Sequence, residues 1–407
     1  MSEAGPASAP ERRGALAGVR VLDLGLLVQG PQAALLLADM GADVVKVELP
    51  ELGDQGRWIP VSLEDRRPPY FIGCNRGKRS VTVDLRSERG REVFFRLADT
   101  ADVVISNFAP GTLERWGIDY ETVSARNPRI VYGQGSTFGS QGPDAPRKGA
   151  DIAGQASGGL IYRTGRGPES VTPVGATIAD HIGSQNLANG VLAALFAREK
   201  SGRGQKVEVS LLGGQIYAQA SEYTYAFLTG RNPGQADRGH ALIPLFYGVF
   251  GTADGHIAIV GVTPPHRAAF FAALGRPELA ADPRFTGAVL SPERRRELFD
   301  LLEECFAKET TAEWERRLAR AGQRFAAVRD YLEVAADEGV YANGYLQRTE
   351  HPEWGALPMV GCPIRMSDTP TRPGALAPEL GQHTEEVLLE LGYDWDEIAA
   401  LRDAKAI

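Results

Sequence analysis

The sequence predicts an α/β fold, in which a large domain built on a mainly parallel sheet is followed by a smaller α+β domain. Between residues 19 and 139, short apolar runs rich in β-branched residues alternate with helical segments. This alternation is typical of a parallel sheet with helices on both faces. After residue 225 the pattern changes to a β-hairpin and two helices. The length of 407 residues also indicates two or three domains rather than one core.

Each element of the large domain has its own local signal. The helix predicted over 31–41 has a proline near its start and a glycine at its end, and the helix over 87–101 begins with a capping serine. The loop before the first helix contains no GxGxxG, so the usual dinucleotide fingerprint is absent. The predicted strands cover residues 19–25, 42–49, 80–85, 102–108 and 129–139.

Changes in composition predict the domain boundaries. A flexible tail covers 1–16, and the large domain covers 17–225. The stretch FLTGRNPGQADRGH is rich in Gly, Pro and polar residues, as linkers are. A small α+β domain follows over 226–330, with a hairpin at 247–261 around Ala-Asp-Gly. The segment 331–407 contains short strands, a Pro-rich loop and two helices, and we expect it to return to the large domain.

Composition excludes several classes of protein. The formal net charge of -8 argues against nucleic acid as a main partner, because no basic surplus is present to neutralise phosphates. The three cysteines include no CxxC pair, so neither a disulfide framework nor a zinc site is predicted. No apolar run approaches the ~20 residues that span a bilayer, and the first fifteen residues lack the apolar core of a secretory signal. We therefore expect a soluble, cytoplasmic protein with no metal and no membrane contact.

One carboxylate lies among small and apolar residues in the segment ATIADHIGS. Asp180 directly precedes an amphipathic helix, and spacing alone favours a helix N-cap over a catalytic group. The two roles are compatible, because a helix N-terminus stabilises a carboxylate and a carboxylate can attack an activated acyl group. The neighbouring His181 would point about 100° away on a helix, which places the two side chains poorly for joint action.

Two basic segments are candidates for anion binding. Lys78 and Arg79 precede a predicted strand in CNRGKRSVTVDL, where they form either a solvated turn or a cradle for phosphates. Lys148 and Asp151 lie in the Gly-rich stretch APRKGADIAGQASGG. The plainer interpretation of that pair, compared with anion binding, is that Lys148 is exposed and that Asp151 caps a helix beginning at Ile152.

A third candidate segment follows a predicted parallel strand. Asn107 and Phe108 come at its carboxyl end, where open α/β sheets bind ligands, and Arg115 follows in the next helix. The alternative is an asparagine turn with the phenylalanine in the core. Each of these signals is weak by itself.

Taken together, the motifs resemble the class III CoA-transferases, the family that includes formyl-CoA transferase, the carnitine CoA-transferases and the related alpha-methylacyl-CoA racemases. The resemblance runs from about Gly18 to the C-terminus. The motifs that carry it, in chain order, are GVRVLDLGLLVQGPQAALLLADMGADVVKVE, NRGKRSVTVDL, ADVVISNFAPGTLERWG, NPRIVYGQGSTFG, GQASGG and VGATIADHIGSQNLANGVLAALFAREKSGRGQKVEVSLL.

The resemblance implies that Asp180 is the nucleophile of a CoA-transferase. CoA would move from an acyl-CoA to a small carboxylic acid through aspartyl anhydride and aspartyl-CoA thioester intermediates. CoA is then a substrate, and no tightly bound cofactor is expected. The family fold is a Rossmann-like large domain with a small domain, and two chains thread through each other as an interlocked homodimer.

The resemblance also assigns CoA contacts. An arginine near the adenine in formyl-CoA transferase is Leu49 here, so the nucleotide contacts must differ in detail. Lys78 and Arg79 are expected near the phosphates, the first loop near the pantetheine, and Asp151 beside the reaction centre. The implied cofactor-binding residues are Leu27, Val28, Gln29, Lys78, Arg79, Asn107, Phe108, Arg115, Lys148 and Asp151.

Two other functions stay open at this point. A racemase needs a histidine where this chain has Ala150, and an acid that the segment VGVTPPH lacks, so racemisation is disfavoured. A CoA-binding protein without catalysis is the second alternative. The substrate pair is undetermined. Arg163 or Arg166 is a candidate to hold a second carboxylate, although two exposed loop arginines are the plainer interpretation, and succinyl-CoA is a common donor in the family.

Overall fold

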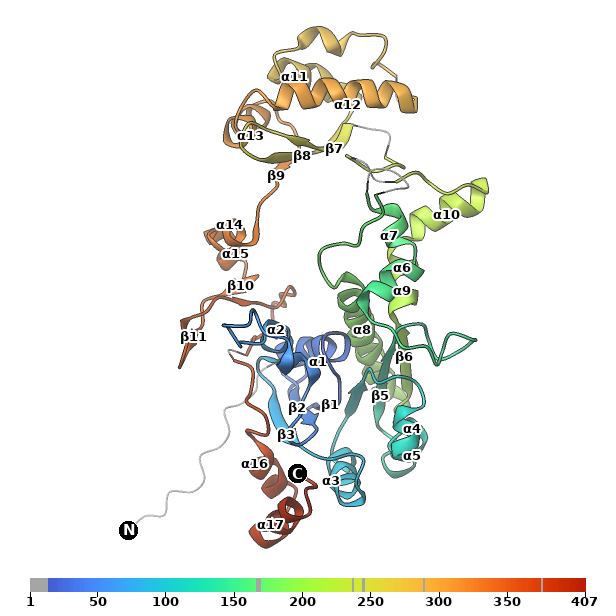
Figure 1. Cartoon of the computed structure of the whole chain (residues 1–407), viewed down its shortest axis with the longest axis vertical. Helices are drawn as coiled ribbons and strands as arrows, with labels where there is room; N and C mark the ends of the chain where they lie inside the picture. The colour runs from blue at the N-terminus through green and yellow to red at the C-terminus, as the bar shows by residue number, and fades with distance from the viewer. Residues whose placement is uncertain (1–13, 166–169, 236–237, 244–245, 288–289, 375) are drawn as a thin grey trace. The chain divides into compact units, whose positions relative to one another are not determined.

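The structure, a computed structural model, describes residues 14–165, 170–235, 238–243, 246–287, 290–374 and 376–407 (Figure 1). The chain divides into two compact units. Unit 1 comprises 1–158, 175–218 and 337–407, and unit 2 comprises 159–174 and 219–336. The C-terminal segment thus belongs, from residue 337 onwards, to the unit that contains the parallel-sheet region of the N-terminal half. Of the range 159–174, the described residues 159–165 and 170–174 cluster with unit 2, although the sequence contains no linker signal there.

Unit 1 is built on a six-stranded sheet in which every neighbouring pair is parallel, in the order β3-β2-β1-β4-β5-β6. The predicted α/β class with a parallel sheet is confirmed. The order reverses between β1 and β4, which creates the crevice where such sheets bind ligands. The strands are β1 Arg20–Asp23, β2 Asp43–Glu48, β3 Arg79–Thr82, β4 Val103–Ser106, β5 Val131–Ser136 and β6 Lys206–Ser210.

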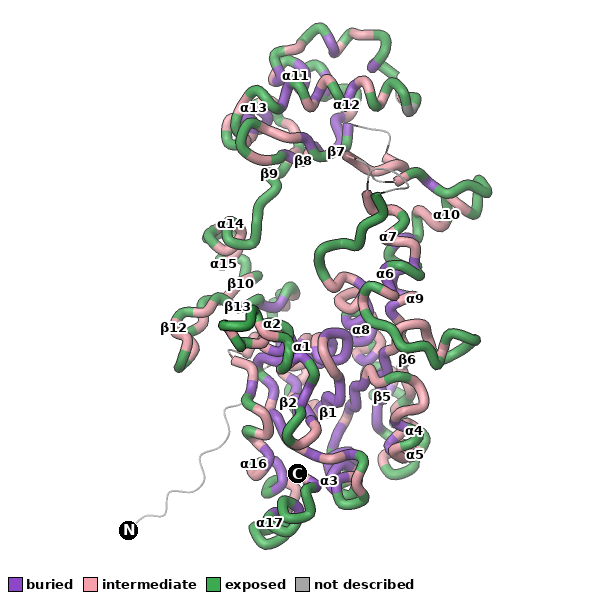
Figure 2. Tube along the Cα trace, viewed as in Figure 1, coloured by how far each residue is buried: buried purple, intermediate pink, exposed green. Residues whose placement is uncertain are grey.

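Helices cover both faces of this sheet. Successive side chains of a strand point to opposite sides, so each buried strand has apolar side chains on both faces. In β2, Val44 packs against α1 (Gln29–Asp39) and α8 (Ile178–Ser201), whereas Val45 packs into the core on the other face. The buried strands between the two helical layers are drawn in purple in Figure 2. The helices of the second face are α3 Glu88–Asp99, α5 Tyr120–Arg126, α16 Thr384–Glu390 and α17 Trp395–Asp403.

The serine cap predicted for the second helix is confirmed, since Ser87 accepts a hydrogen bond from the Gly90 N–H at the start of α3.

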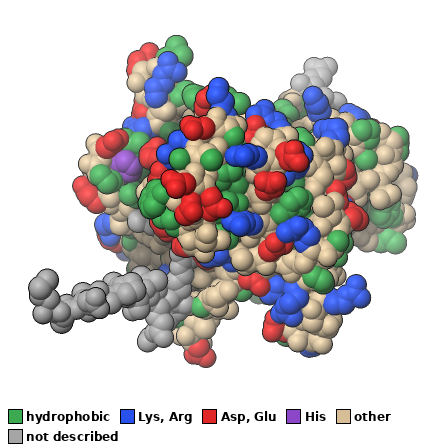
Figure 3. All heavy atoms as spheres, turned by 90° about the horizontal axis from the view of Figure 1, so that it is seen from below, with side chains coloured by type: hydrophobic (Ala, Val, Ile, Leu, Met, Phe, Trp, Pro, Cys, Tyr) green, Lys and Arg blue, Asp and Glu red, His purple; other side chains and the backbone are tan. Residues whose placement is uncertain are grey.

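The face of the molecule drawn in Figure 3 carries Lys and Arg side chains among Asp and Glu side chains. The other elements of unit 1 are η1 Gln55–Trp58, α2 Pro69–Asn75, α4 Thr112–Trp116, α6 Asp151–Ser157, α9 Leu211–Ala218, α15 Glu338–Ala342, β10 Leu346–Gln347, β11 Glu350–His351, β12 Gly355–Ala356 and β13 Met359–Val360.

Unit 2 has its own antiparallel sheet and an aromatic core. The predicted hairpin is confirmed as β7 (Phe246–Gly251) paired with β8 (His256–Val262), and β9 (Phe325–Ala327) adds a third strand. Phe250 of β7 and Trp314 of α13 (Thr311–Arg320) both belong to the buried core of this unit. The helices of unit 2 are α7 Leu160–Arg163, α10 Ala220–Thr229, η2 Pro264–His266, α11 Arg267–Ala273, η3 Pro277–Ala280, α12 Pro292–Phe306, α13 Thr311–Arg320 and α14 Tyr331–Ala335.

Candidate active site

A cavity of about 290 Å³ opens in unit 1 at the carboxyl ends of β1, β4 and β5. Its walls come from the loop between β1 and α1 (the first loop, residues 25–28), from the segment after β4, from the end of β5 and from the start of α8. This is the position expected for a ligand site in an open parallel sheet. The structure brings seven of the predicted site residues together in its walls: Leu27, Val28, Gln29, Asn107, Phe108, Lys148 and Asp180.

Asp180 is the third residue of α8, so the prediction that it caps this helix is wrong. The N-cap residue is Thr177, and its side chain makes no capping bond. The Asp180 side chain is therefore not engaged in capping and lines the cavity. A carboxyl group in the first turn of a helix, facing a cavity, is placed to react with a bound ligand.

The capping carboxylate of α8 comes from Asp151, 28 residues before Ala179. One oxygen of Asp151 accepts hydrogen bonds from the N–H groups of Ala179 (2.7 Å) and Asp180 (3.1 Å), and the other accepts one from Gln155 Nε2 (2.5 Å). Asp151 is itself the first residue of α6, so its predicted role as the cap of a helix beginning at Ile152 is wrong. The helix that it caps is the one that carries Asp180.

Burial and a like charge act together on the Asp180 carboxyl group. Loss of contact with water, and to a smaller extent the negative charge of Asp151, raise the pKa of Asp180 to about 7. Burial also lowers the pKa of the neighbouring His181. Perturbed carboxyl groups in clefts are a physical mark of functional sites. Near neutral pH, Asp180 exists as both acid and carboxylate.

Gln29 presents an unsatisfied donor in the cavity that Asp180 also lines. It is the first residue of α1 and is 3% exposed. Among the described residues, its Nε2 has no hydrogen-bond partner. The side chain fits between two glycines, since a Cβ on Gly135 would lie 2.4 Å from Oε1 and a Cβ on Gly183 would lie 2.8 Å from Nε2. A buried amide without a partner is costly, and a ligand in the cavity can supply the missing acceptor.

Asn107 and Phe108 lie in the cavity wall, although the Asn107 amide is engaged by the protein itself. Its Oδ1 accepts from the Leu26 N–H (2.8 Å) and its Nδ2 donates to the Leu26 carbonyl (2.9 Å). The Phe108 ring packs edge-on against Trp116, with the ring centroids 5.0 Å apart. Asn107 thus fixes the first loop, while Phe108 supplies an apolar surface.

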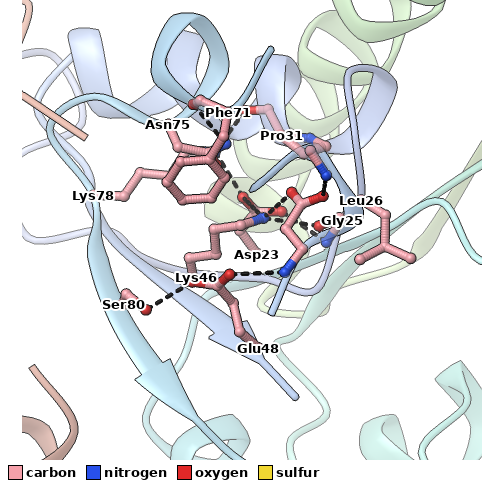
Figure 4. Close-up of polar contacts among 12 residues, drawn as sticks. Asp23, Gly25, Leu26, Pro31, Lys46, Glu48, Phe71, Asn75, Lys78 and Ser80 are labelled. Atoms are coloured by element: carbon pink, nitrogen blue, oxygen red, sulfur yellow. Dashed lines mark hydrogen bonds and ion pairs between the residues drawn. The ribbon is translucent and has the colours of Figure 1, made fainter. Parts of the chain in front are cut away.

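Four predicted residues do not line the cavity: Lys78, Arg79, Arg115 and Asp151. The Lys78 ammonium is fully buried and donates to Asp23, the Pro31 carbonyl and Asn75, each at 2.7 Å. Figure 4 shows this group facing Asp23 and Asn75.

Arg79 and Arg115 also have partners within unit 1. Arg79 pairs with Asp43, Glu386 and Glu390, and Arg115 donates to Thr112 Oγ1 at 3.0 Å. Lys78 is occupied by structural contacts, so in this conformation its ammonium does not reach a phosphate. The expectation of a phosphate contact at Lys78 therefore needs correction, because the group is enclosed by acceptors from β1, α1 and α2.

Sequence reasoning missed four polar residues of the cavity wall. Gln55 begins η1, and Thr137 and Arg147 lie in loops, where composition gives no distinct signal. Ser136 ends β5 and so occupies the carboxyl edge of the sheet. Ala150, the residue that replaces a racemase histidine, also lines the cavity and offers only a methyl group. The missed residues are Gln55, Ser136, Thr137 and Arg147.

The two arginines considered for a second carboxylate lie elsewhere. Arg163 belongs to unit 2 and donates to the Gly234 carbonyl, and Arg166 lies outside the described residues. Across the described ranges, no group of three or more His, Cys, Asp and Glu side chains is arranged to hold a metal ion. In the same part of the chain, no helix has the length and apolar character needed to cross a bilayer.

The fold and the cavity define a class: an α/β protein with a ligand site at the carboxyl ends of a parallel sheet, and with a carboxyl group of raised pKa in its wall. Comparison with known proteins gives the family. The model of CoA-transferase family III matches residues 16–384, and the chain belongs to this family. It is therefore a class III CoA-transferase.

Relatives of the chain match over nearly its whole length. It is 32% identical to a succinyl-CoA–D-citramalate CoA-transferase of Chloroflexus aurantiacus, over 96% of this chain and 97% of the relative. It is 33% identical to a formyl-CoA:oxalate CoA-transferase of Streptomyces coelicolor, over 97% and 99%. The crystal structure of a CaiB/BaiF family protein from Brucella suis superposes with a TM-score of 0.83, at 32% identity, over 93% of this chain and 100% of that one.

Proposed function

We propose that this protein moves CoA from an acyl-CoA to a carboxylic acid through covalent intermediates on Asp180. The observation that carries the proposal is the Asp180 carboxyl group, which lines the cavity of a class III CoA-transferase and has a pKa raised to about 7 by burial and by Asp151. A desolvated carboxylate is a better nucleophile than one in water, and a covalent route divides one difficult transfer into easier steps.

The first half of the cycle loads CoA onto the enzyme. A carboxylate oxygen of Asp180 attacks the thioester carbon of the donor, the C–S bond breaks, and the CoA thiolate leaves an acyl-aspartyl anhydride behind. The thiolate then attacks the aspartyl carbonyl carbon. The donor acid departs as its carboxylate, and Asp180 carries CoA as a thioester.

The second half returns the carboxylate. The acceptor carboxylate attacks the aspartyl-CoA carbonyl, and the thiolate leaves a second anhydride. The thiolate then attacks the acceptor's acyl carbon, which releases the new acyl-CoA and the free Asp180 carboxylate. Each addition places negative charge on a carbonyl oxygen, and the buried Nε2 of Gln29 is the donor that we assign to that oxygen.

The remaining cavity residues are assigned to CoA. The backbone of Leu27 and Val28 faces the pantetheine arm, and Phe108 packs against its apolar part. Lys148 approaches a phosphate from the rim of the cavity, with Arg147 next to it. Asp151 acts on Asp180 through the helix start rather than by touching the substrate.

Replacement of the nucleophile tests this function. Asp180→Ala is expected to lower the rate of CoA transfer by about 1,000-fold or more, because no other carboxylate lines the cavity within the described residues. CoA binding, followed by calorimetry, is expected to stay within about threefold of wild type. Succinyl-CoA and formyl-CoA are the first donors to assay, since relatives carry these names.

Retained transfer in Asp180→Ala contradicts the proposed mechanism. Exchange of the α-proton of an acyl-CoA into heavy water, without transfer, points instead to racemisation, which Ala150 disfavours. CoA binding with no transfer by the wild-type protein over a wide panel of donors and acceptors points to a binding protein.

We also propose a homodimer. No residue of α10 is buried, and Phe227 and Leu228 are 80% and 82% exposed. Large apolar side chains with this exposure mark an interaction surface, and a second copy of the chain is the partner that the family resemblance implies. Light scattering is expected to give twice the monomer mass of 43.8 kDa, and a monomer at micromolar concentration contradicts the proposal.

A further inference from the structure

The first loop, residues 25–28 between β1 and α1, forms one wall of the Asp180 cavity and is bonded to buried side chains. The Gly25 N–H donates to Asp23 Oδ1 at 2.8 Å, and the Gly25 carbonyl accepts from Lys46 Nζ at 2.8 Å. Figure 4 shows the Lys46 side chain directed at this turn.

The next backbone groups of the first loop also bond to side chains. Asn107 closes a two-bond ring on Leu26, and the Leu27 N–H donates to Asp54 Oδ1 at 2.8 Å. Five successive polar groups of the loop backbone, from the Gly25 N–H to the Leu27 N–H, therefore have a side-chain partner. Such complete satisfaction fixes one conformation of a loop.

The conformation that these bonds hold is an unfavourable one. Leu27 has φ of 61°, in the left-handed region where the side chain of a non-glycine residue approaches its own backbone. Residues held in such regions cluster at functional sites, where the surrounding structure determines them. Leu27 and the next two residues line the cavity, so the strained turn orients the wall directly.

Buried side chains with no net charge as a group bind the backbone of the first loop. The Lys46 ammonium lies 2.9 Å from Asp54 Oδ2 and 3.6 Å from Asp23 Oδ2, and all three side chains have no exposed surface. Lys78 adds a second cation at 2.7 Å from Asp23. Two lysines thus face two aspartates, and each charge has a partner that keeps it in place.

We propose that Asp54, supported by Lys46, is a positioning residue for the transfer reaction. It holds Leu27 in the left-handed conformation, and so directs the first loop and the Gln29 amide at the group that reacts on Asp180. The inference rests on the proposed CoA transfer, and Asp54 itself does not touch the cavity.

The first test compares two buried ion pairs. Asp54→Ala removes the acceptor of the Leu27 N–H, whereas Asp39→Ala breaks the equally buried pair with Arg76 (2.8 Å) at the other end of α1. Both variants are expected to unfold at lower temperature. Only Asp54→Ala is expected to lower kcat of CoA transfer, by about tenfold or more, at a temperature where both are folded.

A double-mutant cycle isolates the strain at Leu27. Glycine adopts a positive φ without penalty, so the effect of Asp54→Ala on kcat is expected to fall from about tenfold to below about threefold in the Leu27→Gly background. If Asp54→Ala does not yield folded protein, Leu27→Ile leaves the charge cluster intact. It conserves volume, and its β-branch opposes the left-handed conformation, so a similar loss of kcat is expected.

Hydrogen exchange gives a readout that does not depend on catalysis. Asp54→Ala is expected to speed exchange at the amides of Leu26 and Leu27, and Asp39→Ala is not. Equal losses of kcat in the two alanine variants, an unchanged Asp54→Ala effect in the Leu27→Gly background, or unchanged exchange in the first loop would each overturn the inference. A wild-type protein with no transfer but with the predicted exchange pattern would instead overturn only the proposed function.

Discussion

Two buried aspartates of unit 1, Asp23 and Asp180, have opposite electrostatic surroundings. Burial alone would raise the pKa of Asp23, but Lys46 and Lys78 overcome this effect and lower it. Burial, together with the like charge of its neighbour Asp151, raises the pKa of Asp180 to about 7. The same residue type is thus a permanent anion at one position and a titrating group at the other.

The difference separates a structural carboxylate from a reactive one. On folding, the Asp23 carboxylate loses its hydration and gains two lysine ammonium groups and the Gly25 N–H as partners. Its charge therefore stabilises the first loop. The Asp180 carboxylate loses its hydration and gains only a cavity wall and the like charge of Asp151, so its charged form is destabilised until a substrate arrives. Proteins accept such a loss of stability where chemistry needs it.

The largest effect is expected at the structural carboxylate. Asp23→Asn leaves two buried ammonium groups with one fewer counter-charge, and a broken buried pair costs about 3–5 kcal/mol of the free energy of unfolding. Chemical denaturation measures this loss. Asp65→Asn is the control, because its ion pair with Arg67 is exposed and contributes little. Equal midpoints in the two variants would contradict the role given to Asp23.

The next effect concerns the Gln29 amide, which lines the same cavity as Asp180. Gly135→Ala would put a Cβ 2.4 Å from Gln29 Oε1, so the amide must move and its proposed donor role is lost. We expect kcat of CoA transfer to fall by roughly 10- to 100-fold. Gly73→Ala is a matched control, since a Cβ there meets no atom within 4 Å. An unchanged kcat in Gly135→Ala would remove Gln29 from the mechanism.

A smaller effect is a gain of stability at the reactive carboxyl. Because the pKa of Asp180 is raised from 3.8 to about 7, the folded protein keeps a proton that the unfolded chain has lost in that window, and stability falls as pH rises through it. Asp180→Asn removes this loss. The variant is expected to melt a few degrees above wild type at pH 8 and by less at pH 5. A lower melting temperature at pH 8 would contradict the assigned pKa.

The smallest effect separates the two causes of that pKa. Asp151→Asn removes the like charge but not the burial, which is the larger cause. The rate of aspartyl adduct formation is expected to fall as pH drops through about 7 in the wild-type protein, because Asp180 becomes protonated; this fall is the acid limb of the pH profile. In the variant the midpoint of the acid limb is expected to be lower by less than about one pH unit. Asp99→Asn, in an exposed pair with Arg126 away from the cavity lining, is a control for general charge. A limb that moves upward in Asp151→Asn would show that the charge of Asp151 does not act on Asp180.

Local pattern predicted the parts of the fold that depend on neighbours in sequence. The strands of the parallel sheet, the Ser87 cap and the hairpin all follow from residues a few positions apart. The seven cavity residues followed from the family motifs, which place residues from separate strands at one edge of the sheet.

Contacts between distant segments could not be predicted in this way. The cap of α8 comes from Asp151 on another helix, which no pattern around Asp180 indicates. Lys78 was expected in a solvated turn or near a phosphate, because its acceptors on β1, α1 and α2 are distant in sequence or carry no local signal. The left-handed Leu27 depends on Asp54, 27 residues away, and leucine itself gives no sign of it.

The central claim is that Asp180 becomes covalently linked to CoA. Incubation of the pure protein with a panel of acyl-CoAs, digestion and mass spectrometry of the peptide that contains Asp180 test it directly. We predict a mass increase on Asp180 that corresponds to CoA or to the donor acyl group, and its absence in Asp180→Asn. Efficient CoA transfer with an unmodified Asp180 peptide, or an adduct on another residue, would contradict the account.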